Sequence, residues 1–274
     1  MTSPKFHLPP QSDPPLSPRL TLPTMYDLPS EDPEGPGLPD EFHIYQPQLL
    51  RETFQSPQWQ PDLVFSATDL NLYYDLSHPN WYKRPDWFGI VGVSRLYEGR
   101  DLRLSYVIWQ EQLSPFVVVE LLSPGTEAED LGETVRSSGN PPTKWQVYER
   151  ILRVLYYIVF SRYTDQLQIF RLIGGHYEAA QVTEAGLAIP ELELTLGLWR
   201  GNYQNIDRLW LRWLTIEGNL ILTPSEQALA AQQQATEVEQ QLAVAQQQAR
   251  EAEQRAERLA ARLRELGVEP DQLV

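Results

Sequence analysis

The sequence contains no cysteine among its 274 residues. Disulfide bonds, thiolate metal sites and a cysteine nucleophile are therefore excluded. Histidine is scarce as well, and the spacing of the four histidines does not fit a histidine-based zinc site. The four are His7, His43, His78 and His176. Any metal chemistry of this chain is therefore expected to rest on oxygen ligands.

Long apolar runs are absent too. No stretch approaches the roughly 20 residues that span a bilayer, and the N-terminus lacks the apolar centre of a secretion signal. We therefore expect a soluble, cytoplasmic protein with no membrane partner.

Basic residues are fewer than acidic ones. The chain has 22 Lys and Arg against 37 Asp and Glu, a formal net charge of -15. This balance argues against a strongly cationic protein that binds nucleic acid of any sequence by neutralising phosphates. It does not exclude an enzyme that contacts nucleic acid through a local basic face, because arrangement matters more than the sum.

Proline is concentrated at one end. Residues 1–40 hold 11 of the 23 prolines and few large apolar residues, which predicts a disordered arm. The alternative is a Pro-rich ligand for a partner domain. We expect the remaining chain to comprise a folded domain over 41–215, a linker over 216–227, a helix over 228–267 and a tail over 268–274.

The predicted C-terminal helix carries a sustained heptad. Its apolar positions alternate in steps of three and four, with Gln, Glu and Arg between them, which is typical of a coiled coil. Most of these positions are alanine, so pairing should be weak except near Leu259 to Leu266. We expect an assembly or spacer element that allows a homo-oligomer. The alternative is a single solvated helix.

The folded domain is expected to be of mixed α/β class. Apolar runs predict strands, Gly174-Gly175 predicts a hairpin turn, and Thr143 is a plausible N-cap of a helix. That helix has an apolar stripe of Trp145, Tyr148, Ile151, Leu152 and Leu155. The other expected elements are a helix over 47–54, strands over 62–67, 71–75, 87–93, 106–109, 116–122 and 156–160, a hairpin over 166–172 and 176–182, an alternating segment over 189–196, a polar loop over 124–143, and a helix or strand over 207–214.

Glu120 stands out within this pattern. Phe116 to Val119 precede it, two leucines follow it, and Ser123-Pro124-Gly125 ends the run. This is typical of a strand buried on both faces, where an unpaired carboxylate is costly. Glu120 is therefore expected to have a function or a dedicated partner.

Asp86, Glu120 and Lys144 are the candidate catalytic residues. Two carboxylates on neighbouring strands can hold a hard divalent cation, with the Leu121 carbonyl as a further ligand. A nearby lysine could orient or deprotonate a water molecule. The residue types alone leave a structural alternative open, in which Asp86 is a turn residue, Glu120 pairs with an arginine such as Arg84, and Lys144 is solvated.

Several ordered motifs resemble the Uma-two family of restriction-endonuclease-like proteins, within the PD-(D/E)XK nuclease superfamily. The resemblance covers roughly residues 40–215. The motifs are Arg84-Pro-Asp-Trp-Phe, Phe116-Val-Val-Val-Glu-Leu-Leu-Ser-Pro-Gly-Thr, Lys144-x-x-x-Tyr148 and Tyr156-Tyr-Ile-Val-Phe. The resemblance implies a restriction-endonuclease-like mixed β-sheet flanked by helices. It also implies that Asp86 and Glu120 bind Mg²⁺, with Mn²⁺ as a substitute, and that Lys144 is the catalytic lysine.

One position departs from the superfamily pattern. Glu-x-Lys would place a lysine at position 122, which is Leu122 here, so the lysine must come from the following helix. The expected function is a Mg²⁺-dependent endonuclease that hydrolyses DNA phosphodiester bonds. The alternatives are a catalytically silent scaffold that binds protein partners through its tail, and a phosphodiesterase acting on RNA or a small molecule.

Overall fold

The computed structural model describes Pro14 and residues 40–123, 127–136 and 139–266. The chain divides into two compact units, Met1–Ile221 and Leu222–Val274. Apart from Pro14 and Asp40, the expected proline-rich arm lies outside the described residues, as does the expected tail over 268–274. The first unit is of mixed α/β class, as expected.

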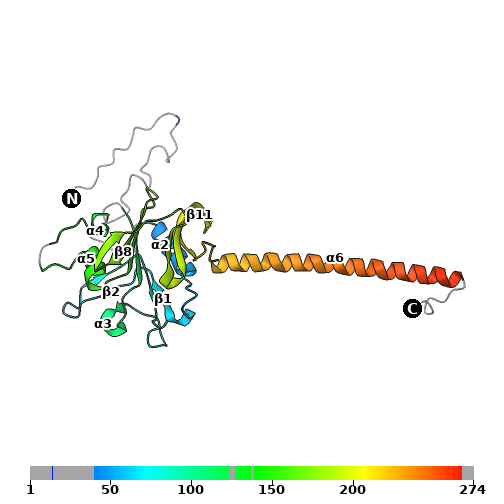
Figure 1. Ribbon diagram of the computed structural model, residues 1–274, viewed down its shortest axis with the longest axis horizontal. Helices are drawn as coiled ribbons and strands as arrows, with labels where there is room; N and C mark the ends of the chain where they lie inside the picture. The colour runs from blue at the N-terminus through cyan, green and yellow to red at the C-terminus, as the bar shows by residue number, and fades with distance from the viewer. Residues whose placement is uncertain (1–13, 15–39, 124–126, 137–138, 267–274) are drawn as a thin grey trace. The chain divides into compact units, whose positions relative to one another are not determined.

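A six-stranded mixed sheet forms the centre of the first unit (Figure 1). Its order is β1-β4-β6-β7-β8-β9, in which β6 and β7 run parallel and the other neighbours antiparallel. The strands are β1 (Val64–Ala67), β4 (Trp87–Val91), β6 (Val117–Leu121), β7 (Tyr156–Phe160), β8 (Leu167–Ile173) and β9 (His176–Ala179). Every residue of β6 and β7 is buried, which explains their continuous apolar sequences.

The predicted hairpin at Gly174-Gly175 is confirmed. Both glycines have positive φ angles, 59° and 95°, and they join β8 to β9. The segment over 207–214, which the sequence leaves open between helix and strand, is a strand. The tryptophans Trp210 and Trp213 of this strand, β12 (Ile206–Thr215), are buried in the core.

Two three-stranded sheets accompany the central one. The first has the order β10-β11-β12 and the second the order β3-β2-β5. Their strands are β10 (Leu187–Ile189), β11 (Leu194–Tyr203), β12 (Ile206–Thr215), β2 (Leu72–Tyr73), β3 (Tyr82–Lys83) and β5 (Tyr106–Val107).

The central sheet separates two hydrophobic clusters. On one face, side chains such as Trp87 and Val119 pack against helix α2 (Phe42–Thr53) and the sheet of β11 and β12. On the other face, Phe88 and Val118 pack against the helical segment after Thr143 and against β2 and β5. Successive strand residues alternate between these faces, so each strand contributes to both clusters.

Several predicted boundaries are wrong. Helix α2 begins five residues before the expected start at Pro47, which lies inside the helix and not in its first turn. The expected strand over 106–109 pairs only at Tyr106 and Val107 before helix α3 (Ile108–Glu111) begins. A short apolar run does not distinguish a strand from a helical turn. Two 3₁₀ turns complete this unit, at Pro61–Leu63 and Pro190–Leu192.

The segment from 124 to 155 also differs from the prediction. Helix α4 (Glu127–Asp130) lies within the expected loop, and positions 124–126 and 137–138 lie outside the described residues. Helix α5 (Lys144–Gln146) continues as a π-helical turn over Val147–Ile151. The wider turn shifts the apolar phase and leaves Ile151 45% exposed, whereas Leu155, 39% exposed, lies beyond the helix, whose C-cap is Leu152.

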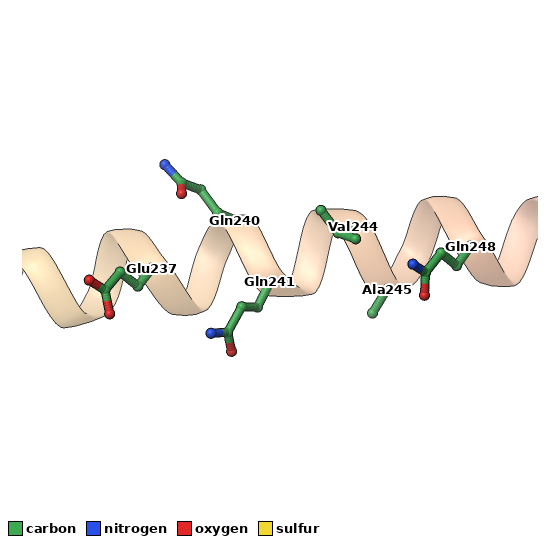
Figure 2. Close-up of a pocket in the computed structure, with 6 residues that line it drawn as sticks. All are labelled: Glu237, Gln240, Gln241, Val244, Ala245 and Gln248. Carbon is green, nitrogen blue, oxygen red and sulfur yellow. The ribbon is translucent and has the colours of Figure 1, made fainter.

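The second unit contains the long helix α6 (Pro224–Glu265). Thr223 caps it through a reciprocal pair with Glu226, and none of its residues is buried. Figure 2 shows side chains around a shallow hollow on this single helix, all of them exposed. The expected helix is present, and its pairing as a coiled coil stays a prediction. None of the helices in the described part of the chain has the length and apolarity to cross a bilayer.

Candidate functional site

Asp86 and Glu120 lie opposite each other because of the register between β4 and β6. Trp87 pairs with Val119 in this antiparallel ladder, so the preceding Asp86 faces the following Glu120. The Asp86 N–H donates to Glu120 Oε2 at 3.4 Å, and the Leu121 N–H donates to Asp86 Oδ2 at 2.6 Å. The expected alternative partner of Glu120, Arg84, pairs with Asp69 instead.

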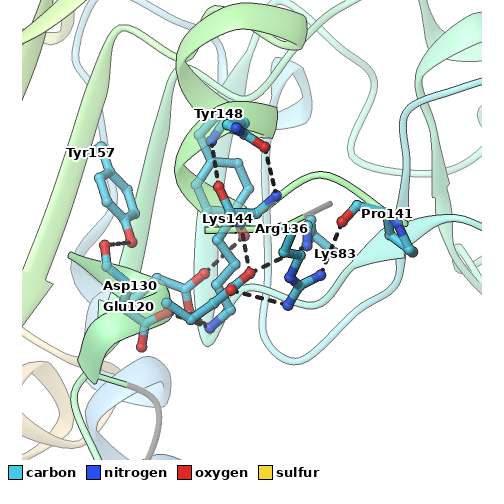
Figure 3. A network of polar contacts seen from close by, with 11 residues as sticks. Lys83, Glu120, Asp130, Arg136, Pro141, Lys144, Tyr148 and Tyr157 are labelled. Atoms are coloured by element: carbon cyan, nitrogen blue, oxygen red, sulfur yellow. Dashed lines mark hydrogen bonds and ion pairs between the residues drawn. The ribbon is translucent and has the colours of Figure 1, made fainter. Parts of the chain in front are cut away.

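Lys144 lies beside the two carboxylates and comes from a different element, the helix α5. Thr143 and Gln146 form a reciprocal capping box that fixes the start of α5, with Lys144 as its first residue. Lys144 Nζ lies 3.0 Å from Glu120 Oε2 (Figure 3). The structure therefore brings the three sequence-predicted residues together, and the lysine of this group comes from α5 and not from position 122.

Asp130 is a site residue that the sequence did not single out. Its carboxylate Oδ1 lies 2.7 Å from Lys144 Nζ, and the residue is 1% exposed. The Tyr157 hydroxyl donates to the Asp130 carbonyl at 2.8 Å, which fixes the end of α4 (Figure 3). Gly132, with φ at +77°, lets the chain turn tightly against the Trp145 ring. A third carboxylate thus lies beside the lysine.

Glu129 anchors α4 to the start of α5. Its carboxylate accepts a hydrogen bond from the Lys144 backbone N–H at 2.9 Å, and it forms ion pairs with Arg136 at 3.0 Å and Lys83 at 3.6 Å. These partners, labelled in Figure 3, come from three separate segments of the chain, and together they hold Glu129 in place beside the start of α5. Part of the segment expected to be a polar loop over 124–143 therefore belongs to the site.

Tyr148 holds the second oxygen of Glu120. Its hydroxyl donates to Glu120 Oε1 at 2.8 Å, whereas the sequence assigned Tyr148 to an apolar stripe. The spacing of four residues between Lys144 and Tyr148 could have indicated this role, because such residues share one helix face. Lys144 and Tyr148 together occupy both carboxylate oxygens of Glu120.

His43 approaches the site from α2. Its Nδ1 lies 2.9 Å from Asp40 Oδ1 and its Nε2 lies 3.1 Å from the Leu121 carbonyl, in a pocket that leaves the residue 2% exposed. Both partners only accept, so both ring nitrogens must donate. The Leu121 carbonyl, expected as a metal ligand, is therefore already hydrogen-bonded, although a carbonyl oxygen retains a second lone pair.

Burial dominates the electrostatics of the carboxylates. It raises the pKa of Glu120 to about 8, with Lys144 opposing and Asp130 and Asp86 reinforcing the shift. Burial also raises the pKa of Asp86, although the charges of Lys144 and His43 act to lower it. Burial lowers the pKa of Lys144, but the three carboxylates outweigh it and leave the pKa above its ordinary value. The lysine is therefore an ammonium at neutral pH.

The donor set is compatible with a hard divalent cation. Three acids face one amine, so full ionisation leaves excess negative charge, and Asp130 Oδ2 has no hydrogen-bond partner among the described residues. Within those residues, no three His, Asp or Glu side chains form a ready-made metal cage. Mg²⁺ does not need such a cage, since it binds through one or two carboxylates and keeps several water molecules. Asp86 and Glu120 fit this mode.

The fold and the site define a mixed α/β domain with a carboxylate pair beside a lysine, in which Glu120 is buried and Asp86 is partly buried. The chain matches the Uma2 family, described as "Putative restriction endonuclease", over residues 34–207. That match spans more than half of the chain, and the protein belongs to this family. No curated protein matches the chain.

Proposed function

We propose that this protein is a Mg²⁺-dependent endonuclease that hydrolyses DNA phosphodiester bonds. The observation that carries the proposal is the convergence of Asp86, Glu120 and Lys144, with Lys144 Nζ 3.0 Å from Glu120 Oε2. Membership of the Uma2 family, described as "Putative restriction endonuclease", supports DNA as the substrate. Mn²⁺ is the expected substitute for Mg²⁺.

In this proposal Asp86 and Glu120 hold the cation. When bound, the cation supplies positive charge beside the reacting phosphate and makes a water molecule more acidic. Asp86 is oriented for this role by the Leu121 N–H, and Glu120 by the Tyr148 hydroxyl. Both carboxylates are thus pre-positioned by groups that remain in place during the reaction.

Lys144 has the remaining role. Its ammonium lies between Glu120 and Asp130, and it stabilises negative charge that develops on the phosphate in the transition state. Its pKa is above the ordinary value, so it acts as a charged donor that orients a water molecule and not as a base. Asp130 holds this ammonium in place at 2.7 Å.

The direct test is metal-dependent cleavage of plasmid DNA by the purified protein. Nicking or linearisation is expected with Mg²⁺ or Mn²⁺ and not with EDTA. Glu120→Gln and Asp86→Asn should each reduce the rate by at least about a hundredfold, the scale of removing a key electrostatic group. Glu191→Gln is a matched control, because this acid pairs with Arg171 elsewhere in the unit. Cleavage by Glu120→Gln at the rate of the parent would refute the assignment.

A catalytically silent scaffold is the second candidate. The observation that favours it is the self-contained pairing of the site, in which both Glu120 oxygens have donors within the protein. Such a network stabilises a fold without catalysis. The net charge of -15 and the lack of any buried residue in α6 point the same way. Absence of cleavage and of Mn²⁺ binding together would favour the scaffold.

A further inference from the structure

Two arginines gather on one aromatic ring close to the proposed active site. The guanidinium of Arg208 lies 4.3 Å from the centre of the Phe42 ring, and that of Arg162 lies 5.8 Å from the same ring. Arg208 also lies over Trp210 at 5.5 Å. Stacking of this kind holds a planar guanidinium in a fixed orientation while leaving its N–H groups available.

This arginine pair carries more positive charge than its neighbours neutralise. Arg162 forms an ion pair with Asp40 at 3.0 Å, but Arg208 has no carboxylate within ion-pair distance among the described residues. Its contacts are backbone carbonyl oxygens at 3.4 Å. Asp40 also accepts from His43, whose two nitrogens both donate, and its charge acts on Arg208 as well. One carboxylate therefore faces three cationic groups, Arg162, His43 and Arg208.

The remaining polar neighbours do not remove the excess. The Tyr163 hydroxyl donates to Asp40 at 3.4 Å, and the exposed Asp165 lies near enough to favour the charged form of Arg208. Burial, followed by the charge of Arg162, lowers the pKa of Arg208. An incoming anion would relieve this repulsion between the two guanidinium groups.

The pair lies at the same end of the sheet as Glu120. Leu121, the residue after Glu120, pairs with Phe160 in the parallel ladder, and Arg162 follows two residues later. The contacts run without interruption from Arg162 through Asp40 and His43 to the Leu121 carbonyl. In a chain of net charge -15, a local positive surface beside the carboxylates is where a polyanion would be attracted.

We infer that Arg162 and Arg208 form a phosphate anchor that holds the DNA backbone next to the cleavage site. The choice of DNA as the ligand rests on the proposed function. Two guanidinium forks suit phosphate oxygens, which accept paired N–H donors. The side chain of Arg162 is 28% exposed and Arg208 is partly exposed, so a phosphate can reach both. This anchor contacts the backbone and therefore adds affinity without sequence preference.

The test is duplex binding as a function of salt concentration, measured with a labelled oligonucleotide. It uses the full-length Glu120→Gln background, in which cleavage should be at least about a hundredfold slower than in the parent. Arg208→Gln should weaken binding about tenfold and reduce the slope of log K against log salt by about 1. Arg208→Lys keeps the charge, so it should keep the slope and lose less affinity. Arg171→Gln is the control, because this arginine pairs with Glu191 and lies over the Tyr156 ring.

Each outcome separates the anchor from the proposed reaction. If Arg208→Gln binds like Arg171→Gln, or if the protein does not bind the duplex, the anchor is refuted. If plasmid cleavage by the parent is nevertheless observed, the proposed function stands without the anchor. If the slope falls as expected but the parent never cuts with Mg²⁺ or Mn²⁺, the anchor stands and the nuclease assignment fails.

Discussion

The hydroxyl of Tyr148 is the one donor to Glu120 Oε1 among the described contacts. Tyr148→Phe removes this donor, so the free energy of unfolding should fall by about 1–2 kcal/mol. The melting temperature should fall by a few degrees. Because Glu120 loses an orienting group, plasmid cleavage should fall as well.

Tyr177→Phe separates the two effects of that change. Its hydroxyl donates to the Val154 carbonyl at 3.0 Å, away from the carboxylates. This variant should lose similar stability and retain the cleavage rate of the parent. Equal loss of cleavage in both variants would mean that Tyr148 acts only through the fold.

Lys83 gives the site a pH-dependent stability. Burial lowers its pKa to about 8, with Glu129 partly opposing, whereas the unfolded chain keeps the ordinary value near 10.5. Between these values the unfolded state binds more protons, so this residue's contribution to stability rises with pH. Relative to Lys83→Met, the parent should therefore gain melting temperature as the pH increases from 7.5 to 9.5.

Arg84→Met is the matched control for this titration. Arg84 neighbours Lys83 in sequence and stays charged throughout this pH range. The hydrogen bond to Asp69 raises the pKa of Arg84 by more than burial lowers it. The difference in melting temperature between Arg84→Met and the parent should not change with pH over the same range. A pH-independent difference for Lys83→Met would contradict the depressed pKa of Lys83.

The site residues differ in how readily they can be identified from the sequence. Glu120 could be found because an acid inside an apolar run is costly, and Asp86 and Lys144 through their motifs. Asp130 could not, because four acids over 127–133 look alike until α4 buries one of them. His43 was missed because Pro47 suggested too late a start for α2.

At the scale of elements, two helices offer a matched comparison. Thr143 and Thr223 both form capping boxes, at the starts of α5 and α6, and both are buried. Thr143→Ala should cost about 1 kcal/mol and reduce cleavage, because Lys144 is the first residue of α5. Melting and cleavage assays measure the two effects.

Thr223→Ala should weaken its helix without altering cleavage. Circular dichroism should register a small loss of helical signal at the start of α6. If both variants left cleavage unchanged, the cap of α5 would not be what positions Lys144.

Strands were easier to predict than the helical segments. Apolar runs bounded by turn residues identified β6 and β7 because burial on both faces demands continuous apolar sequence. The stripe predicted after Thr143 held at Leu152 but failed at Ile151, because a π-helical turn has a period that a regular 3.6-residue pattern does not describe. Tertiary contacts also decided that β12 is a strand, since its apolar and tryptophan residues suit either state.

At the scale of the whole molecule, α6 is the element that could assemble copies of the chain. Its heptad positions are mostly alanine, so we expect weak, concentration-dependent self-association in sedimentation experiments. Replacing Leu259 and Leu263 with Asp should abolish it. These leucines lie in the part of the heptad that offers the largest apolar side chains.

Leu229→Asp is the control for that experiment. Leu229 is 57% exposed and lies outside the heptad register, so its replacement should leave association unchanged. Sedimentation of the parent as a monomer at every concentration would instead support a single solvated helix. Cleavage assays on the same variants would reveal whether association matters for the reaction.

The central claim is that two acids far apart in the chain share one divalent cation beside an amine from α5. It is tested most directly by a crystal structure of the protein soaked in Mn²⁺, with anomalous scattering to locate the ion. We predict a peak about 2.1 Å from carboxylate oxygens of both Asp86 and Glu120, the distance typical of a small hard cation. An occupied Mn²⁺ site elsewhere, or an unchanged 3.0 Å contact between Lys144 and Glu120 with no ion between the acids, would contradict it.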